Sequence, residues 1–198
     1  AGGLDLPRTD LGPLLPADLL RKMKETGGKD AWKRRAEALG VAEELLARHP
    51  LVEANRACRA LLDGLKLRLQ DTNVNLKAKA VEAIGALGQC VGARAAAKYA
   101  KGTAQVLLAC SSDRKATLRE AVMAAAERWV VHDGELATAV LDHFVSALPA
   151  ALGSAVGSKS NAEARIDVLN WALPHVRRLQ PRTASGAAAR GVRDGDEV

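Results

Sequence analysis

The feature that most constrains this chain is a turn that recurs four times at a nearly constant distance. At each turn an acidic or small polar residue leads into a basic, helix-forming segment. The four turns begin at Asp30, Asp71, Asp113 and Ser160, so successive turns are 41, 42 and 47 residues apart. Periods of this length are typical of helical hairpins that stack side by side to bury their apolar faces. The spacing therefore predicts a stack of hairpins with all four turns along one edge.

Apolar residues on both sides of each turn recur every three or four residues, which is the period of an amphipathic helix. The second hairpin shows this at Ala57, Leu61, Leu65 and Leu69, and then at Leu76, Ala80, Ile84 and Leu87. Aromatic residues make up only 3% of a chain that is 48% hydrophobic, which favours helices over strands. We therefore predict an all-α fold, an α-solenoid of about four HEAT-type helical hairpins.

The composition also suggests how the chain is divided. Residues 1–15 contain three Gly and two Pro and predict an extended leader, residues 16–179 hold the repeats, and residues 180–198 have the composition of a disordered tail. Pro174 should kink the last helix or end it early. The first residue is Ala and not Met, so we expect this sequence to be part of a longer chain.

Several classes of function are not supported by the sequence. Cys58, Cys90 and Cys110 lack CxxC spacing, which favours a reducing compartment and argues against zinc. We find no signal peptide, no run of 18 apolar residues and no nucleotide-binding, HExxH or GxSxG motif. We therefore predict that the chain is not an enzyme and needs no cofactor or metal. Its net charge of +6 instead favours an acidic partner.

The turns contain residues with two different expected roles. Asp71 is followed six residues later by Lys77, and Asp113 by Arg119, a pattern suited to helix caps and ion pairs between successive repeats. The neighbouring side chains are not needed for that role and should face solvent, at Trp32, Lys33, Asn73, Val74, Arg114 and Lys115. These six residues are candidates for binding a partner.

We expect different positions for the three Trp residues. Trp32 lies in the first turn of a helix, where it can either pack into the hairpin core or stand at the edge as an apolar anchor for a partner. Trp129 and Trp171 lie late in their helices within apolar stripes, so we expect both in the core.

Several segments resemble the TOG domain, a tubulin-binding HEAT-repeat module. Residues 29–39 resemble its first repeat, residues 68–73 its second turn and residues 113–119 its third turn. Residues 6–11, 161–165 and 169–171 look most like the fourth TOG domain of the TOG-array microtubule polymerase family. The likeness extends over about residues 6–179, although that family has six hairpins and only four are recognisable here.

The resemblance implies that the turn edge binds αβ-tubulin or the microtubule. Carried over by position, the binding residues would be Trp32, Lys33, Asn73, Val74, Arg114, Lys115, Lys159 and Asn161. It also implies a cytoplasmic, cytoskeletal location on microtubules, the centrosome or spindle, or the axoneme, and partners that include other domains of a longer chain.

Two other partners remain open. A generic HEAT-repeat adaptor would bind an acidic peptide or protein along a concave face lined by the second helix of each hairpin. Nucleic acid is a third option, but only one Tyr and one Phe are available for base stacking. The position of the basic residues should discriminate between tubulin and a peptide as the partner. Lys and Arg residues at the turn edge favour tubulin, and Lys and Arg residues in the groove favour a peptide.

Overall fold

A computed structural model describes residues 6–132, 135–154 and 161–179. Within these residues the chain forms eight α-helices and two short 3₁₀ helices. The α-helices are α1 (Leu19–Lys24), α2 (Ala31–Arg48), α3 (Arg56–Arg68), α4 (Val74–Cys90), α5 (Gly92–Ala109), α6 (Ala116–Val130), α7 (Glu135–Ser154) and α8 (Asn161–Leu179). The 3₁₀ helices are η1 (Gly12–Leu14) and η2 (Cys110–Ser112). The predicted all-α class is confirmed.

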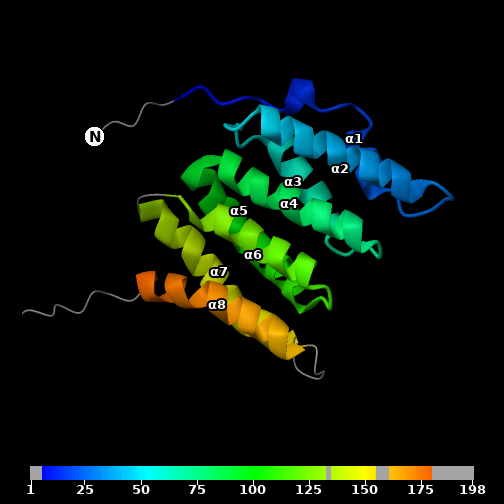
Figure 1. The fold of residues 1–198 in the computed structure, drawn as a ribbon. Coiled ribbons are helices and arrows are strands. Elements are labelled where there is room, and N and C mark those ends of the chain that lie inside the picture. The colour runs from blue at the N-terminus through cyan, green and yellow to red at the C-terminus, as the bar shows by residue number, and fades with distance from the viewer. Residues whose placement is uncertain (1–5, 133–134, 155–160, 180–198) are drawn as a thin grey trace, which may run out of the picture.

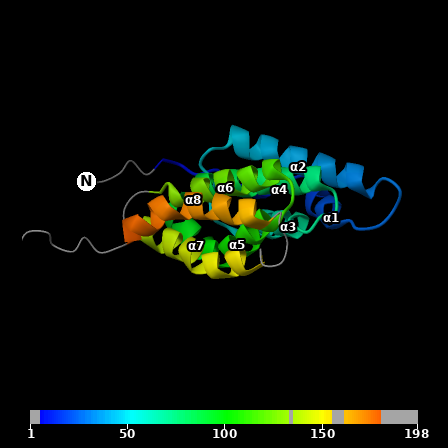
Figure 2. The ribbon, with the colours of Figure 1, turned by 60° about the horizontal axis from the view of Figure 1, so that its bottom comes forward.

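The helices pair into four hairpins that stack in two layers. Each odd-numbered helix is followed by an even-numbered helix that folds back along it (Figure 1). Helices α2, α4, α6 and α8 lie side by side in one layer, and α1, α3, α5 and α7 form the other (Figure 2). This is the predicted α-solenoid of four hairpins.

The core between the layers is built from the predicted apolar stripes. Its largest fully buried side chain is Trp129, whose ring centroid lies 6.3 Å from that of Phe144 and whose Nε1 donates a hydrogen bond to the Ile84 carbonyl at 3.0 Å. A Cβ at Gly88 would lie 2.4 Å from the Trp129 indole. Only Gly therefore lets α4 approach this ring, and the core position expected for Trp129 is confirmed. Trp171 is half-buried against Phe144 and His175.

A ladder of ion pairs links α2, α4 and α6 each to the hairpin that follows. Arg35 of α2 binds Asp71 at 2.8 Å, and Lys77 of α4 binds Asp113 at 3.2 Å. Arg119 of α6 binds both Asp167 at 2.7 Å and Glu163 at 3.0 Å. The inter-repeat pairing expected for the acidic and basic turn residues is thus confirmed.

The predicted capping role of the turn aspartates is wrong. The N-cap of α4 is Asn73, whose side chain accepts from the Asn75 N–H, while Asp71 lies two residues earlier and accepts from the Asn73 N–H. Asp113 likewise accepts from the Lys115 N–H. Asp30 occupies the N-cap position of α2, but its side chain makes no capping hydrogen bond. The physical reason is that Asp71 and Asp113 each close an Asx turn before the helix. That turn aims the carboxylate at the previous repeat.

Asp71 has the most deeply buried side chain of the ladder. Burial tends to raise the pKa of its carboxyl group, but the Asn73 N–H and the guanidinium groups of Arg35 and Arg68 outweigh this and hold the pKa below the usual range. A carboxyl group whose pKa is lowered by folding stabilises the fold above its ordinary pKa. This contribution is lost as the pH falls through the lower, folded-state pKa.

The segment before α1 packs on the first two hairpins. The Thr9 N–H donates to the Leu51 carbonyl at 2.8 Å, and Arg8 Nη1 donates to the Cys90 carbonyl at 3.1 Å. Leu11 is fully buried. The division into leader, repeats and tail remains a prediction, and the predicted tail from residue 180 onward lies outside the described residues.

The fourth hairpin differs from the other three. Helix α8 continues through Pro174 to Leu179, so of the two effects expected of Pro174, a kink or an early end, the early end does not occur. In helix α7, residues 136–153 are apolar and long enough to cross a membrane. However, Val140, Phe144 and Leu148 of α7 are buried in the solenoid core, so packing accounts for this apolar character.

Helix α8 also presents an apolar stripe to solvent. In α2, α4 and α6, the residue that lies 13 or 14 positions after the start of the turn contacts the next even helix. These equivalent residues are Glu43, Gly85 and Glu127. Leu173 occupies the same place after the fourth turn and is 52% exposed, with Ile166 and Leu169 exposed beside it. Arg165 occupies the ladder position of Arg35, Lys77 and Arg119, yet no acidic partner binds it within the described residues.

We predict that Asp71→Asn lowers the free energy of unfolding by about 3 kcal/mol, because removing one member of a buried ion pair leaves the opposite charges buried without compensation. The matched control is Asp63→Asn, since Asp63 is exposed and pairs with Arg59 and Lys66 at the surface. It should cost no more than about 1 kcal/mol. Urea unfolding followed by circular dichroism measures both values, and equal losses would contradict the assigned role of the ladder.

Candidate protein-binding edge

The turns within the hairpins lie along one edge of the solenoid. On the right of Figure 1, the α1–α2, α3–α4 and α5–α6 turns follow one another, and α8 begins on the same side. Trp32 and Lys33 stand in the first turn of α2, and Asn73 and Val74 at the start of α4. Arg114 and Lys115 directly precede α6. The fold therefore brings six of the eight candidate residues to the same edge.

Trp32 lies at the surface of this edge. Its side chain is 49% exposed, whereas Ala31 and Arg35 beside it in α2 are buried. Helix α2 thus buries the face that carries Ala31 and Arg35 and turns Trp32 outward. Of the two positions open to Trp32 from the sequence, the structure selects the solvent-facing one.

Lys33 lies next to the exposed ring. Its Nζ is 5.8 Å from the centroid of Trp32 and 2.9 Å from Asp30 Oδ1. Both contacts are exposed and are therefore weak. The Lys33 ammonium group can leave them for a carboxylate of a partner at little cost.

Asn73 and Val74 have partly structural roles. Asn73 is half-buried and caps α4 through its side-chain oxygen at 3.0 Å from the Asn75 nitrogen. Val74 is half-buried and packs against the core. Asn73 and Val74 therefore offer only a small exposed surface to a partner, between the first and third turns.

Arg114 and Lys115 project from a turn with a fixed backbone. Buried Arg119 donates to the carbonyls of Arg114 at 3.1 Å and Asp113 at 3.3 Å, and the Lys115 N–H donates to Asp113 Oδ1 at 3.0 Å. Both side chains are exposed, and neither forms an ion pair within the described part of the chain. The same Arg119 that joins the repeats thus holds two free positive charges in place.

A hollow of about 700 Å³ lies between the second and third turns. Its wall includes apolar Val74 and Val106 and the basic side chains of Lys77, Arg114 and Lys115. A partner residue with an apolar body and an acidic end would fit this combination. Such a hollow gives the edge shape as well as charge.

The two remaining candidates cannot be placed in the same way. Lys159 lies outside the described residues, and Asn161 begins α8 but its side chain is also outside them. Both therefore stay predictions.

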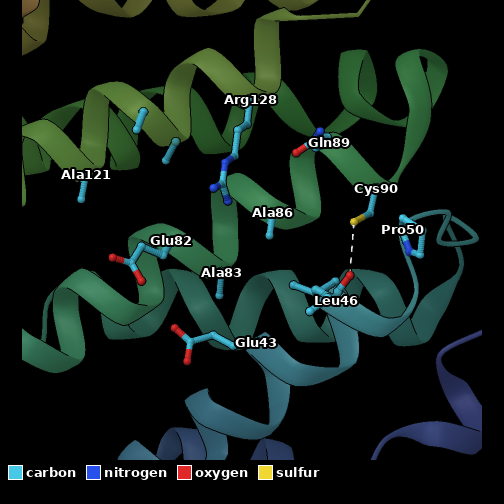
Figure 3. Close-up of a pocket in the computed structure, with 13 residues that line it drawn as sticks. Glu43, Leu46, Pro50, Glu82, Ala83, Ala86, Gln89, Cys90, Ala121 and Arg128 are labelled. Atoms are coloured by element: carbon cyan, nitrogen blue, oxygen red, sulfur yellow. Dashed lines mark hydrogen bonds between the residues drawn. The ribbon is translucent and has the colours of Figure 1, made fainter.

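A second hollow, of about 590 Å³, lies between the even helices α2, α4 and α6. Figure 3 shows Glu43 and Glu82 on one side of it and Arg128 reaching in from α6, above a floor that includes Ala83 and Ala86. Two carboxylates and one guanidinium group do not favour an acidic ligand. The groove alternative drawn from the sequence therefore lacks the basic residues that it requires.

Several contacts between and within the repeats were not predicted from the sequence. Arg68 is a second partner of Asp71 at 3.0 Å, and Glu127 accepts from Trp171 at 3.1 Å and contacts His175 at 2.8 Å. These contacts join residues 3, 44 and 48 positions apart. Only a repeat-by-repeat alignment of the turns could have suggested the two longer ones.

The described residues contain no group of three or more His, Cys, Asp and Glu side chains that could hold a metal ion. Burial raises the pKa of Cys58 and Cys110 to about 11. Both thiols are therefore protonated at neutral pH and are poor nucleophiles and metal ligands.

Four stacked hairpins, an ion-pair ladder between them and a single edge of turns define a HEAT-type helical-repeat module. Its fold is that of solved TOG-domain structures. A chain from work on the structural basis of microtubule plus-end tracking by XMAP215, CLIP-170 and EB1 superposes with a TM-score of 0.57, 20% identity and 89% coverage of both chains. A chain from work on tubulin recruitment and assembly by microtubule polymerases with TOG domain arrays gives a TM-score of 0.54 at 14% identity, covering 90% of this chain and 46% of that one.

Two plant proteins are similar in sequence. Protein MOR1 of Oryza sativa subsp. japonica is 29% identical over 175 residues, and Protein MOR1 of Arabidopsis thaliana is 30% identical over 177 residues. The matches cover 88% and 86% of this chain but only 8% of each relative. No protein-family model matches the chain.

The exposure of Trp32 leads to a prediction about stability. Trp32→Ala should change the free energy of unfolding by no more than about 0.5 kcal/mol, because surface substitutions rarely do more. Trp129→Ala should cost about 3 to 5 kcal/mol, because it leaves a cavity in the core. Thermal melts of the two variants beside the parent chain test this difference. A loss at Trp32 as large as that at Trp129 would place the Trp32 ring in the core.

Proposed function

We propose that this chain is a tubulin-binding module that holds αβ-tubulin, free or in the microtubule, through its turn edge. The observation that carries the proposal is the half-exposed Trp32 beside Lys33, in line with free Arg114 and Lys115 on a rigid third turn. Exposed aromatic rings among basic residues are characteristic of binding hot spots. The TOG-type fold and the microtubule context of the superposed structures support the same partner.

Within this proposal, Trp32 supplies dry contact area and the basic residues supply attraction. Lys33, Arg114 and Lys115 would steer an acidic surface toward the edge, and Asn73 and Val74 would fill the space between them. Lys159 and Asn161 would extend the contact at the fourth turn. The module is not an enzyme, and its role is to bind.

We further propose that the module is one domain of an array. The segments that resemble a fourth TOG domain, together with relatives of which the chain spans only 8%, support a position in an array of such domains. A cytoplasmic location on microtubules, at the centrosome or spindle or in the axoneme, follows from the proposed partner.

Other domains of a longer chain are the second proposed class of partner. Ile166, Leu169 and Leu173 expose an apolar stripe at the position where every earlier even helix contacts its neighbour. Arg165, beside the stripe, occupies the position of the basic ladder residues but has no acidic partner in the described residues. A neighbouring helical element that carries a carboxylate would cover the apolar stripe and form an ion pair with Arg165.

Substitutions at the edge test the proposed function. Trp32→Ala and Lys115→Ala should each weaken binding to αβ-tubulin by about 1 to 3 kcal/mol, because each removes an exposed side chain that the proposal places in the contact. Affinity is measured by analytical ultracentrifugation or by interferometry with immobilised tubulin.

Matched controls come from the opposite edge of the solenoid. Val131→Ala and Arg48→Ala remove an exposed apolar and an exposed basic side chain at the far ends of α6 and α2, and both should bind tubulin like the parent. If the edge and control variants all bind with the parent affinity, the proposed site is wrong. If the parent does not bind tubulin at all, the proposed function is wrong.

The electrostatic part of the proposal predicts a salt effect on rates. The association rate constant should fall as ionic strength rises from about 50 to about 200 mM, while the dissociation rate constant changes less, because exposed charges act mainly on the encounter. Stopped-flow mixing of labelled tubulin with the chain measures both constants. An association rate constant independent of salt would show that the basic edge does not steer this partner.

A further inference from the structure

The excess positive charge of this chain lies on two neighbouring helices. Helices α3 and α5 together contain seven Lys and Arg residues and a single acidic residue, Asp63. The rest of the chain contains 22 basic and 22 acidic residues. Since the whole chain carries a net charge of +6, these two helices account for all of it.

The basic side chains form one surface on the outside of the odd-helix layer. Five are exposed, and Lys66 is half-buried while Arg68 is buried in the ladder. The exposed residues are Arg56, Arg59, Arg94, Lys98 and Lys101. We call the surface formed by these five residues and Lys66 the basic face.

Two contacts join the α3 and α5 halves of the basic face. The Arg59 guanidinium lies 5.9 Å from the centroid of the Tyr99 ring in α5. A Cβ placed at Gly102 of α5 would lie 3.6 Å from Lys66 Nζ. The positive groups of the two helices are therefore close enough to act on the same ligand.

The fold does not need this charge. Asp63 contacts Arg59 at 3.3 Å and Lys66 at 3.7 Å, but Arg56, Arg94, Lys98 and Lys101 form no ion pair within the described residues. Arg94 also lies in the first turn of α5, where the helix dipole disfavours a cation. Burial lowers the pKa of the Lys66 ammonium group, with Arg59 acting in the same direction and Asp63 against it.

We propose that the basic face binds an extended peptide segment rich in Asp and Glu. From Arg56 to Lys66 the face is ten residues long, or about 15 Å, and the two helices lie about 10 Å apart. An extended peptide of about five residues covers this length. Lys66 and exposed Val106 also line the hollow at the turn edge, so the segment can continue into a partner bound there. The proposal does not depend on that partner being tubulin.

The chemistry of the face favours a peptide over other anions. Tyr99 is the only aromatic side chain of the two helices, and it is buried, so no ring is available for stacking on bases. The exposed large apolar residues of these helices are Leu67 and Val106. They lie toward the turn end and form no stripe of the kind that amphipathic helices insert into membranes.

The test measures fluorescence anisotropy of a labelled twelve-residue peptide of alternating Glu and Gly, titrated with the whole chain at low salt. The variant Lys98→Glu/Lys101→Glu should bind the peptide at least about tenfold more weakly than the parent, because two attractive charges become repulsive. The control variant Arg177→Glu/Arg178→Glu changes the net charge by the same amount on α8, away from the basic face, and should lose less than about threefold. All substituted residues are exposed, and thermal melts confirm that both variants fold.

The outcomes separate this site from the proposed tubulin edge. Selective loss in the α5 variant, with tubulin binding retained, would support the basic face. Equal losses in both variants would show attraction to net charge alone and overturn it. Tighter binding of the face to a DNA duplex or to phosphatidylserine vesicles than to the peptide, abolished by the same α5 substitutions, would overturn the choice of a peptide.

Discussion

Each of the even helices α2, α4 and α6 carries a basic residue near its start that binds a carboxylate of the next hairpin. Arg35 and Asp71 form the most buried of these pairs, with the carboxylate held by two guanidinium groups and a backbone N–H. A buried carboxylate with three donors tolerates little displacement, because each donor lost would leave a desolvated charge. The pair therefore sets the position of the second turn relative to the first, and Lys77 and Arg119 do the same for the later turns. One kind of interaction both stacks the repeats and aligns the turns.

This alignment divides the surface into regions of different chemistry. At the turn edge, the ladder residues Arg35, Asp71 and Arg119 are buried, whereas Trp32 and Lys115 face solvent. The even-helix groove sets Glu43 and Glu82 against Arg128, and the odd-helix layer carries the charge excess on α3 and α5. The edge joins an apolar anchor to free positive charges on a rigid backbone, which is what recognition of an acidic folded protein requires.

Much of the fold could be predicted from the sequence, because a period near 42 residues and stripes at three- and four-residue spacing leave few arrangements other than stacked hairpins. The position of Trp129 followed from its stripe. Trp32 could not be placed in this way, because a residue at the flank of a helix is buried or exposed according to how its neighbours pack. The capping role of Asp71 was predicted wrongly, since an Asp at a helix start and an Asp two residues before it look alike in sequence.

The last ladder contact shows a further limit of the sequence. In the fourth repeat Ser160 and Asn161 replace the acidic turn residue, and the carboxylates that bind Arg119 come from within α8, at Glu163 and Asp167. Because Glu163 and Asp167 are four residues apart, their side chains lie on the same face of α8. That face could not be assigned to Arg119 before the hairpins were stacked.

Hydrogen–deuterium exchange of the chain with and without saturating αβ-tubulin tests the central claim most directly, because it maps the contact without substitutions. We predict slower exchange over residues 25–35, 69–77 and 112–119, with no change at the opposite edge over residues 47–56 and 88–94. Protection confined to the groove segments 82–90 and 121–128, with unchanged turns, would contradict it.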